Sequence, residues 1–311
     1  MNPASRLREV ISQGELIVAP GAFDCITAKT VERAGFTAVY MTGMGTSASR
    51  VGLPDYGLAT MSEMVANASA MTSVIQTPVI ADADTGYGNE LNMVRTVREY
   101  ERHGVAGIHI EDQVFPKKCG HLDKKEIISQ KDFVSKLRAA VGARQNQDFL
   151  IIARTDANSV AGFNEAIDRA NAGLEAGADM ALVEAPETLE QLRQIPRLVG
   201  GPCVLNILVG GKSPLLSLRE VAKLGYKIAL LSDLLLGSAI AAYQKALDLA
   251  FHGRDLSGLE RSLSVREIFN LLDSEQWDNV REGHPAEKNG NGFSNMPVAK
   301  SAAWLSHHRN S

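Results

Sequence analysis

Eight short apolar runs between residues 16 and 232 constrain the fold of this 311-residue chain more than any other feature. The runs are continuous and rich in β-branched side chains, which is typical of strands buried on both faces of a parallel sheet. Amphipathic stretches such as "NELNMVRTVREYERHG" separate the runs and end at glycine, a common helix terminator. The runs lie at residues 16–21, 38–43, 78–84, 107–112, 149–156, 180–185, 202–208 and 226–232.

This alternation predicts an α/β fold, and eight strand–helix units in about 250 residues predict a (β/α)8 TIM barrel. A doubly wound sheet is the alternative, but its first turn is often glycine-rich, and "PGAF" after the first run is not such a turn. We expect residues 1–253 to form the catalytic barrel. We expect residues 254–311 to form a C-terminal helical extension, with a helix at "SVREIFNLLDSEQW" and a loosely ordered polar tail.

The composition excludes several kinds of partner. A formal net charge of −4 gives no electrostatic reason to expect nucleic acid or an anionic membrane. Three scattered cysteines are too few for a disulfide framework and indicate a reducing, cytoplasmic compartment. No secretory signal is visible, and the most apolar segment, "IALLSDLLLGSAIAA", contains Asp233 and is too short for a membrane span. We interpret it as a buried strand that runs into a helix.

Polar residues or glycine occupy the ends of the apolar runs. In a barrel the carboxyl ends of the strands meet at one mouth, where the chemistry of this fold takes place. We therefore expect the acids, the arginine and the amides at these positions to surround one site. In chain order they are Tyr40, Thr42, Gly43, Met44, Asp82, Asp84, His109, Glu111, Asp112, Arg154, Thr155, Asp156, Glu184, Asn206 and Ser232.

The string "DADTGYG" contains candidate metal ligands. Asp82 and Asp84 are two residues apart, so on a regular strand their side chains share one face. Two carboxylates on one face repel each other unless a cation or hydrogen-bond donors satisfy them. With Glu111 nearby, such oxygen ligands suit Mg²⁺ or Mn²⁺ with several retained waters. The alternative is a solvated turn before a helix, where aspartate is also common.

Arg154, near the end of "IIARTD", has two interpretations. Its guanidinium can bind a substrate carboxylate through two parallel hydrogen bonds. It can equally form a structural ion pair with Asp156 or Glu184, and both interpretations stay open on the sequence.

The string "PKKCGH" carries the second candidate for chemistry. A zinc site is unsupported, because it requires several Cys or His ligands and Cys119 has only His121 beside it. A phosphate-binding loop is also unsupported, because it requires a lysine followed by Ser or Thr. What remains is a thiol, Cys119, whose pKa we expect its cationic neighbours to lower. Such a group acts as a nucleophile or as a general acid–base. The alternative is an incidental cysteine in a charged surface turn. The cationic neighbours are Lys117, Lys118 and His121.

"KKCGH" resembles the cysteine signature of the isocitrate lyase branch of the isocitrate lyase / phosphoenolpyruvate mutase superfamily. "GLPDYG", "PVIADADTGYG", "HIEDQ" and "ARTDA" are similar to companion motifs of that family, and the resemblance runs from about residue 20 to residue 253. It implies a barrel enzyme that cleaves or rearranges small dicarboxylates or phosphonates on Mg²⁺. It also implies a homotetramer, a dimer of dimers in which paired subunits exchange the eighth helix.

The resemblance also implies roles for the residues that match these motifs. Asp84 would bind Mg²⁺, and Asp82 and Glu111 would hold its waters. Asp55 would be a catalytic residue near the metal-bound end of the substrate, and Arg154 would be catalytic as well as substrate-binding. The substrate would be contacted by Tyr40, Thr42, Gly43, Met44, Gly120, Arg154, Glu184 and Asn206.

For the cysteine, the resemblance implies an acid. Cys119 would protonate the carbon that leaves as an enolate, and His121 and Lys117 would tune the thiol. The loop from about residue 116 to residue 126 would close over the site.

Three positions bear on the substrate. Methylisocitrate lyases read like "NITEFG" after strand seven, whereas this chain has Leu208 and Val209 where partners of a third carboxylate would stand. Each lost hydrogen bond costs roughly 1–3 kcal/mol, which disfavours methylisocitrate. At the end of strand eight, Ser232 resembles the serine of oxaloacetate hydrolases, where 2,3-dimethylmalate lyases tend to carry proline. We therefore predict hydrolysis of oxaloacetate to oxalate and acetate, with a dimethylmalate or related 2-alkylmalate lyase as the alternative.

Other function classes stay in view. Decarboxylation of oxaloacetate would not need the cysteine, and phosphonate mutases generally lack it because no carbon is protonated. A binding protein without catalysis is disfavoured by the intact Asp82, Asp84, Cys119 and His121.

Overall fold

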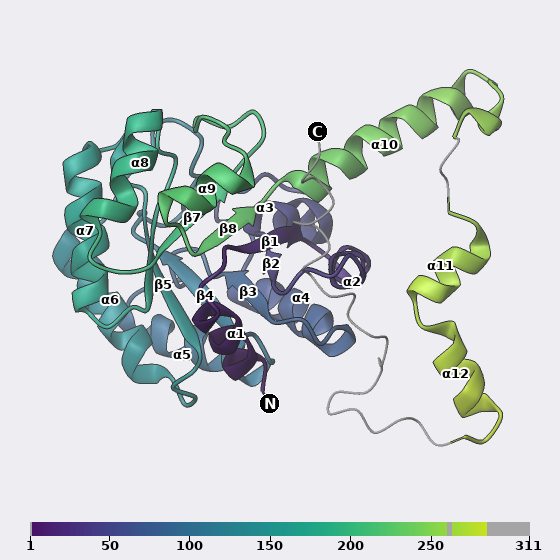
Figure 1. Ribbon diagram of the computed structural model, residues 1–311, viewed down its shortest axis with the longest axis horizontal. Helices are drawn as coiled ribbons and strands as arrows, with labels where there is room; N and C mark the ends of the chain where they lie inside the picture. The colour runs from purple at the N-terminus through teal and green to yellow at the C-terminus, as the bar shows by residue number, and fades with distance from the viewer. Residues whose placement is uncertain (1, 260–262, 285–311) are drawn as a thin grey trace.

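Eight parallel strands close into a barrel in the order in which they occur along the chain (Figure 1). The computed structural model describes residues 2–259 and 263–284, and the predicted polar tail lies almost entirely outside this range. Each strand overlaps one predicted apolar run, so the predicted (β/α)8 barrel is confirmed. The strands are β1 Ile17–Ala22, β2 Val39–Met41, β3 Val79–Asp82, β4 Gly107–Glu111, β5 Leu150–Thr155, β6 Met180–Val183, β7 Cys203–Ile207 and β8 Ile228–Leu231.

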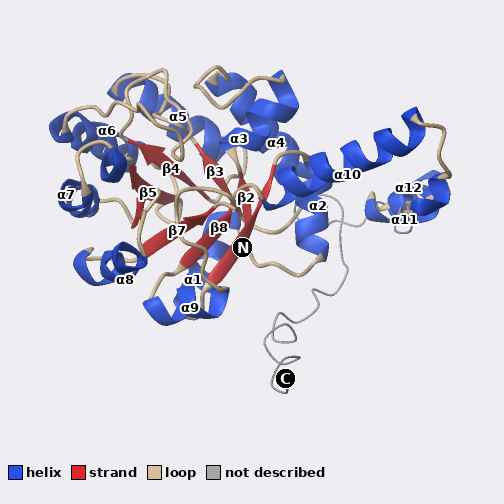
Figure 2. Cartoon of the chain, turned by 90° about the horizontal axis from the view of Figure 1, so that it is seen from above, coloured by secondary structure: helices blue, strands red, loops and turns tan. Residues whose placement is uncertain are grey.

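Helices surround the strands, as the view from above shows (Figure 2). Several begin where the sequence supplies a side-chain cap: Thr60 and Glu63 form a reciprocal capping box at the start of α4. The helices are α1 Pro3–Ser12, α2 Cys25–Arg33, α3 Gly43–Thr46, α4 Met61–Val74, α5 Glu90–Arg102, α6 Gln130–Ala143, α7 Phe163–Glu175, α8 Leu189–Leu198, α9 Leu218–Leu224, α10 Leu234–Phe251, α11 Val265–Leu271 and α12 Ser274–Arg281, with short turns η1 Ser47–Val51, η2 Ala157–Ser159 and η3 Leu256–Gly258.

The amino-terminal end of the barrel is closed by α1. Its Ala4 and Leu7 are buried in the same apolar cluster as Ile17, Ile80 and Ile228 from the strands. Buried side chains of this kind fill a TIM barrel and leave no pore. The carboxyl end of the barrel is therefore the end that is available for a polar site.

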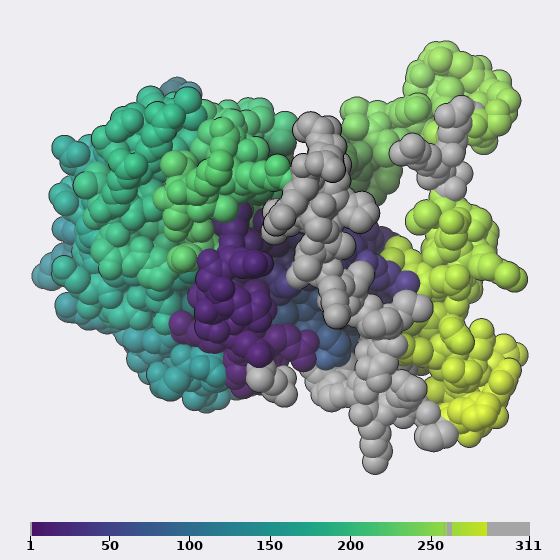
Figure 3. All heavy atoms as spheres, viewed as in Figure 1, coloured from purple at the N-terminus to yellow at the C-terminus, as the bar shows by residue number. Residues whose placement is uncertain are grey.

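The helix after β8 differs from the others. Figures 1 and 3 show α10 projecting away from the barrel, and none of its residues is buried by the described part of the chain. The interpretation as a buried strand running into a helix is right for β8, but the helix is not covered. By length and a mean hydropathy of 1.2, α10 also satisfies the criteria for a membrane span, contrary to our expectation. One such helix is weak evidence, because a helix covered by protein has the same composition.

The extension beyond the barrel contains two short helices where we predicted one. Asp273 separates α11 from α12 with a left-handed backbone, at φ 59°. Its carboxylate is paired with Lys29 and lies 2.7 Å from Arg33 Nη2, both on α2. These ion pairs hold the extension against the side of the barrel.

Candidate active site

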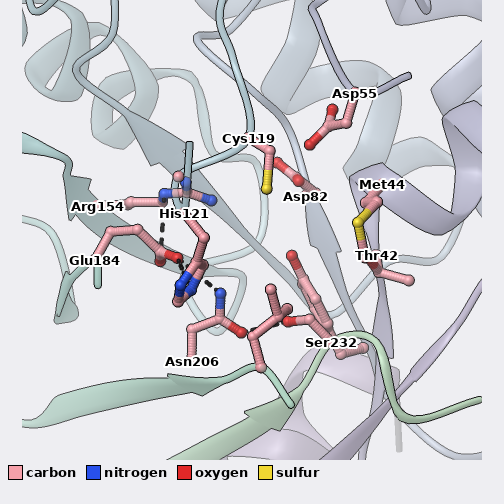
Figure 4. Close-up of a pocket in the computed structure, with 13 residues that line it drawn as sticks. Thr42, Met44, Asp55, Asp82, Cys119, His121, Arg154, Glu184, Asn206 and Ser232 are labelled. Atoms are coloured by element: carbon pink, nitrogen blue, oxygen red, sulfur yellow. Dashed lines mark hydrogen bonds and ion pairs between the residues drawn. The ribbon is translucent and has the colours of Figure 1, made fainter. Parts of the chain in front are cut away.

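A polar pocket lies at the carboxyl end of the barrel, where the predicted site residues converge. Figure 4 shows Cys119 pointing into it, with Arg154 and Glu184 on one side and Thr42 and Met44 on the other. The empty space measures about 330 Å³, counted out to the open mouth. The lining residues are Tyr40, Thr42, Met44, Asp55, Asp82, Cys119, Gly120, His121, Arg154, Glu184, Asn206, Leu208 and Ser232.

The two aspartates of "DADTGYG" are buried, which excludes the alternative of a solvated turn. Asp82 is the last residue of β3, and Asp84 follows the strand with a left-handed backbone at φ 46°. The expectation that both share a strand face is therefore wrong, because the strand ends before Asp84. The backbone N–H of Asp84 instead donates to Asp82 Oδ1 at 2.9 Å. Left-handed aspartate is uncommon and concentrates at functional sites.

Glu111, the last residue of β4, has a carboxylate without a hydrogen-bond partner among the described residues. Burial raises its pKa well above the usual range, although Arg154 Nη2 lies 3.2 Å from Oε2. Within the described residues, no three His, Cys, Asp or Glu side chains form a preformed metal site. Asp82, Asp84 and Glu111 are buried, and among the described residues the Glu111 oxygens have no hydrogen-bond partner and Asp84 Oδ1 has only an ion pair with Lys117. Buried carboxylate oxygens of this kind are ligands that suit Mg²⁺ with several retained waters.

Lys117 is buried between two acids. Its Nζ lies 2.5 Å from Asp55 Oδ1 and 2.9 Å from Asp84 Oδ1. Burial raises the pKa of Asp84 to about 7, with Asp82 and Asp55 adding to the rise and Lys117 opposing it. The lysine thus supplies positive charge to the acids. It also links Asp55 to the loop from about residue 116 to residue 126, the cysteine loop.

The pKa of Cys119 is raised overall, so the expectation of a lowered pKa is wrong even though a cationic neighbour acts in that direction. Burial is the largest cause, Asp55 and Glu184 also raise the pKa, and Lys117 lowers it with a smaller effect. Desolvation disfavours the thiolate, and here it outweighs the nearby cation. The thiol is therefore protonated at neutral pH, as a proton donor has to be.

His121, Glu184, Asn206 and Ser232 form one hydrogen-bonded row along the pocket. His121 Nε2 lies 3.1 Å from Glu184 Oε1, and Asn206 Nδ2 donates to the same oxygen at 2.9 Å. The Ser232 hydroxyl donates to Asn206 Oδ1. The row joins the cysteine loop to the ends of β6, β7 and β8, and Figure 4 shows it along one side of the pocket.

Both interpretations of Arg154 have support. Its Nε donates to Asp156 Oδ2 at 3.0 Å and lies 3.7 Å from Glu184 Oε2, so the structural ion pairs exist. The guanidinium nevertheless lines the pocket. An arginine held this way is oriented before a substrate carboxylate arrives.

The segment after β2 lies close to the acids. A Cβ at Gly43 would fall 2.2 Å from Asp82 Oδ2, so only glycine fits beside that carboxylate. Thr42 caps the short helix α3, and Met44 lines the pocket. The hydroxyl of Tyr40 lies 2.8 Å from His109 Nε2, so a hydrogen bond to a residue of β4 holds this side chain.

The sequence places His109 at the mouth without a role, and the structure shows it fully buried next to Tyr40 and Asp82. One residue near the site was missed. Lys125 is buried at the base of the cysteine loop, and nothing in its sequence context distinguished it from Lys124. One predicted position also differs: Leu208 lines the pocket, but Val209 is 62% exposed.

The cysteine loop lies across the pocket. An antiparallel bridge joins Gln113 to Ile127 at its base, and the Gln113 side chain donates to the Lys118 carbonyl at 2.8 Å. The backbone N–H of Lys212, after β7, donates to His121 Nδ1 at 3.0 Å. Contacts on both sides therefore hold Cys119 over the acids.

A family model described as phosphoenolpyruvate phosphomutase matches residues 7–250. The chain belongs to the isocitrate lyase / phosphoenolpyruvate mutase superfamily. It is 52% identical over 230 residues to a 2,3-dimethylmalate lyase of Eubacterium barkeri, covering 74% of this chain and 80% of that one. It is 42% identical to a 2-methylisocitrate lyase of Aeropyrum pernix, covering 87% of each chain.

Solved structures of the same superfamily are also similar to this chain. An oxaloacetate acetylhydrolase with the inhibitor 3,3-difluorooxalacetate aligns with a TM-score of 0.85 and 36% identity, covering 92% of this chain and 98% of that one. A 2,3-dimethylmalate lyase aligns with a TM-score of 0.84 and 38% identity, covering 95% and 99%. This superfamily member is therefore an enzyme, a carbon–carbon lyase by its relatives.

Proposed function

We propose that this superfamily member cleaves a carbon–carbon bond of a small dicarboxylate with Cys119 as the proton donor. The observation that supports it most is that the half-buried thiol of Cys119, whose pKa is raised, lines the pocket together with Asp55 and Asp82. Cleavage next to a carboxylate leaves an electron pair on carbon, and a protonated thiol can neutralise it. An incidental surface cysteine would have neither the burial nor these neighbours.

We propose Mg²⁺ as the cofactor, with Mn²⁺ as the substitute. Asp84 would hold the ion directly, and Asp82 and Glu111 would hold its waters. The bound ion would polarise the oxygen and carboxylate at one end of the substrate. The partnerless carboxylate of Glu111 supports this assignment, since a buried acid without a donor is costly.

The chain's own residues would perform the remaining steps. Arg154 and Thr42 would bind the carboxylates, and Asp55 is our candidate to accept the hydroxyl proton of a malate-type substrate. The carbon–carbon bond then breaks, its electron pair stays on the carbon next to the carboxylate, and Cys119 gives that carbon its proton. The cysteine loop would exclude water while this happens.

Among the substrates, we place 2,3-dimethylmalate first. The support is the 52% identity to a 2,3-dimethylmalate lyase and the apolar wall that Leu208 gives the pocket. This order reverses the one predicted from Ser232 alone. A methylisocitrate lyase is also a relative. Turnover of methylisocitrate therefore tests whether Leu208, which cannot donate a hydrogen bond to a third carboxylate, excludes that substrate.

Hydrolysis of oxaloacetate is the second candidate, and Ser232 is the observation that favours it. Its buried hydroxyl lines the pocket and donates to Asn206, which leaves its oxygen able to accept from hydrated oxaloacetate. The resemblance to an oxaloacetate acetylhydrolase structure supports the same choice.

We also propose that the chain works in the cytoplasm as a homotetramer, a dimer of dimers in which α10 packs on a second copy. The apolar side chains of α10 are exposed, with Leu247 at 69% and Phe251 at 87%. Surface of this kind marks an interaction site when it is contiguous.

A product assay by NMR tests the proposal. The enzyme is offered 2,3-dimethylmalate, oxaloacetate and methylisocitrate with Mg²⁺, and the C119A variant is run beside it. Propionate with pyruvate supports the lyase, and oxalate with acetate supports the hydrolase. Decarboxylation of oxaloacetate that C119A leaves unchanged would refute carbon–carbon cleavage by this thiol. Pyruvate with succinate would refute the Leu208 argument.

A further inference from the structure

Lys125, near the end of the cysteine loop, is a buried lysine with two specific partners. Its side chain is 1% exposed, and its Nζ lies 2.8 Å from Asp156 Oδ1 after β5. The same Nζ donates to the backbone carbonyl of Gly120, in the middle of the loop. The neighbouring Lys124 is exposed.

The cost of burying an ammonium group indicates that these contacts matter. Lysine is almost never fully buried unless it is paired, because loss of hydration is costly. Here one partner is the carboxylate of Asp156, directly after β5, and the other is the backbone carbonyl of Gly120. Lys125 thus connects the middle of the cysteine loop to the carboxyl end of the barrel.

Asp156 gives this connection a second consequence. Its Oδ2 accepts from Arg154 Nε at 3.0 Å while its Oδ1 pairs with Lys125. One carboxylate therefore orients both the guanidinium that lines the pocket and the lysine that holds the loop. Asp156 is thus a group that helps to place Cys119 and Arg154 relative to each other.

We propose that Lys125 is a positioning residue that holds the cysteine loop closed and sets Cys119 in register with Arg154. Lys125 does not line the pocket itself, and its polar partners are Gly120 and Asp156, so it acts through these two residues. The inference rests on the proposed function for its catalytic consequence, but the closed loop itself can be measured without substrate.

The decisive measurement is the alkylation rate of individual cysteines by N-ethylmaleimide, read by mass spectrometry on the full chain without substrate. Lys125→Met removes the charge and keeps the length, and Lys124→Met is the matched control on the same loop. We expect Cys119 to react about 10- to 100-fold faster in Lys125→Met, the range of one lost charge-assisted hydrogen bond. Loss of a nearby cation cannot cause this, because it raises a thiol pKa and slows alkylation.

Cys203, buried in β7, reports unfolding of the barrel in the same sample. Faster alkylation of Cys119 with Cys203 unchanged supports the proposal. Equal rates in Lys125→Met and Lys124→Met overturn it, and so does a parallel rise at Cys119 and Cys203, which indicates a general structural role. If Lys125→Met does not fold, Lys125→Gln replaces it: the neutral, shorter side chain loses the ion pair with Asp156, so an unchanged Cys119 rate there overturns the proposal as well.

Turnover gives the second readout. With a substrate that the wild-type enzyme cleaves, we expect kcat of Lys125→Met to fall by the same 10- to 100-fold and kcat of Lys124→Met to stay within about twofold. If the wild-type enzyme cleaves none of the three substrates, the proposed function fails, while the alkylation result still decides whether Lys125 holds the loop. An unchanged kcat in Lys125→Met would overturn the positioning role.

Discussion

The mouth of the barrel and helix α10 distribute their side chains in opposite ways. The mouth buries acids, a lysine and an arginine, with Asp84 and Lys117 at 3% and 2% exposure. The helix exposes its apolar residues, with none buried by the described part of the chain. Both arrangements are costly for a single folded chain, because charge prefers water and apolar surface avoids it.

The contrast indicates which kind of binding partner each region requires. The charges of the mouth pair with one another, yet the Glu111 carboxylate has no hydrogen-bond partner among the described residues, which supports the proposed cation and anionic substrate. The apolar side chains of α10 are not buried by the described part of the chain, which supports the proposed second copy on this helix.

Removal of divalent metal should have the largest effect on the mouth. Without the cation, the substrate oxygen is not polarised and the buried acids repel the dicarboxylate, so we expect kcat/KM to fall by about 10⁴-fold in a chelator. Added Mg²⁺ should restore activity and raise the temperature of thermal unfolding, because it binds only the folded mouth. Full activity in the chelator would contradict the metal assignment.

Replacement of the thiol should have the next largest effect. Cys119→Ala removes the proposed proton donor, and we expect kcat to fall by about 10³-fold while the thermal unfolding temperature changes little. Cys25→Ser, at the start of α2 and not among the residues that line the pocket, serves as the matched control and should keep its activity. Equal turnover in both variants would show that no thiol takes part.

Charge on α10 tests the other side of the contrast. We expect the double variant Leu247→Glu with Phe251→Glu to weaken assembly by about 10²-fold or more, because each buried apolar side chain stabilises an interface by roughly 1.5–3 kcal/mol. Native mass and sedimentation should show smaller particles. Lys245→Glu on the same helix is the control, and identical assembly in both variants would remove the case for a second copy on α10.

A smaller effect should separate the two substrates. Ser232→Ala removes a hydroxyl from the pocket, and we expect the ratio of oxaloacetate hydrolysis to dimethylmalate cleavage to fall about tenfold. Ser232→Thr keeps the hydroxyl and should retain most of the ratio. The measurement is kcat/KM for both substrates with each variant, and a ratio that does not change would remove Ser232 from the choice of substrate.

The pH dependence should be the subtlest test of the mouth. Since burial raises the pKa of Cys119 above that of an ordinary thiol, the thiol stays protonated across neutral pH and loses its proton only as pH rises through the raised pKa. An acid works in the protonated form, so kcat should decline on that alkaline side. A kcat that increases with pH there would instead identify a thiolate nucleophile. A Cys25→Ser background leaves Cys119 as the thiol to follow, since the pKa of Cys203 is raised to about 12.

Most of the fold was predictable from local sequence. Continuous apolar runs predict strands buried on both faces, and all eight runs became strands. The helix break at Asp273 was not predictable, because a left-handed aspartate has no strong sequence signal. The exposure of α10 was not predictable either, because an apolar helix has the same composition whether its own chain or another copy covers it.

The sequence predicted which residues meet at the candidate site better than it predicted how they interact. Parallel connectivity places every strand end at one mouth, so Asp82, Glu111, Arg154 and Glu184 had to meet there. The role of Lys125 was hidden, because burial at a loop base depends on what packs over it. The turn at Asp84 was hidden as well, because the end of β3 depends on its pairing with β4.

The sequence by itself determined the barrel, the position of its mouth and the residue types that surround it, because periodicity and chain connectivity are local properties. The tertiary structure alone decided the sign of the Cys119 pKa shift, the partners of Lys117 and Lys125, and the exposure of Val209 and α10. These quantities depend on desolvation and on distances between residues far apart in the chain. A lysine beside a cysteine predicts a thiolate only where water still reaches the sulfur, and here the folded loop keeps the sulfur largely away from water.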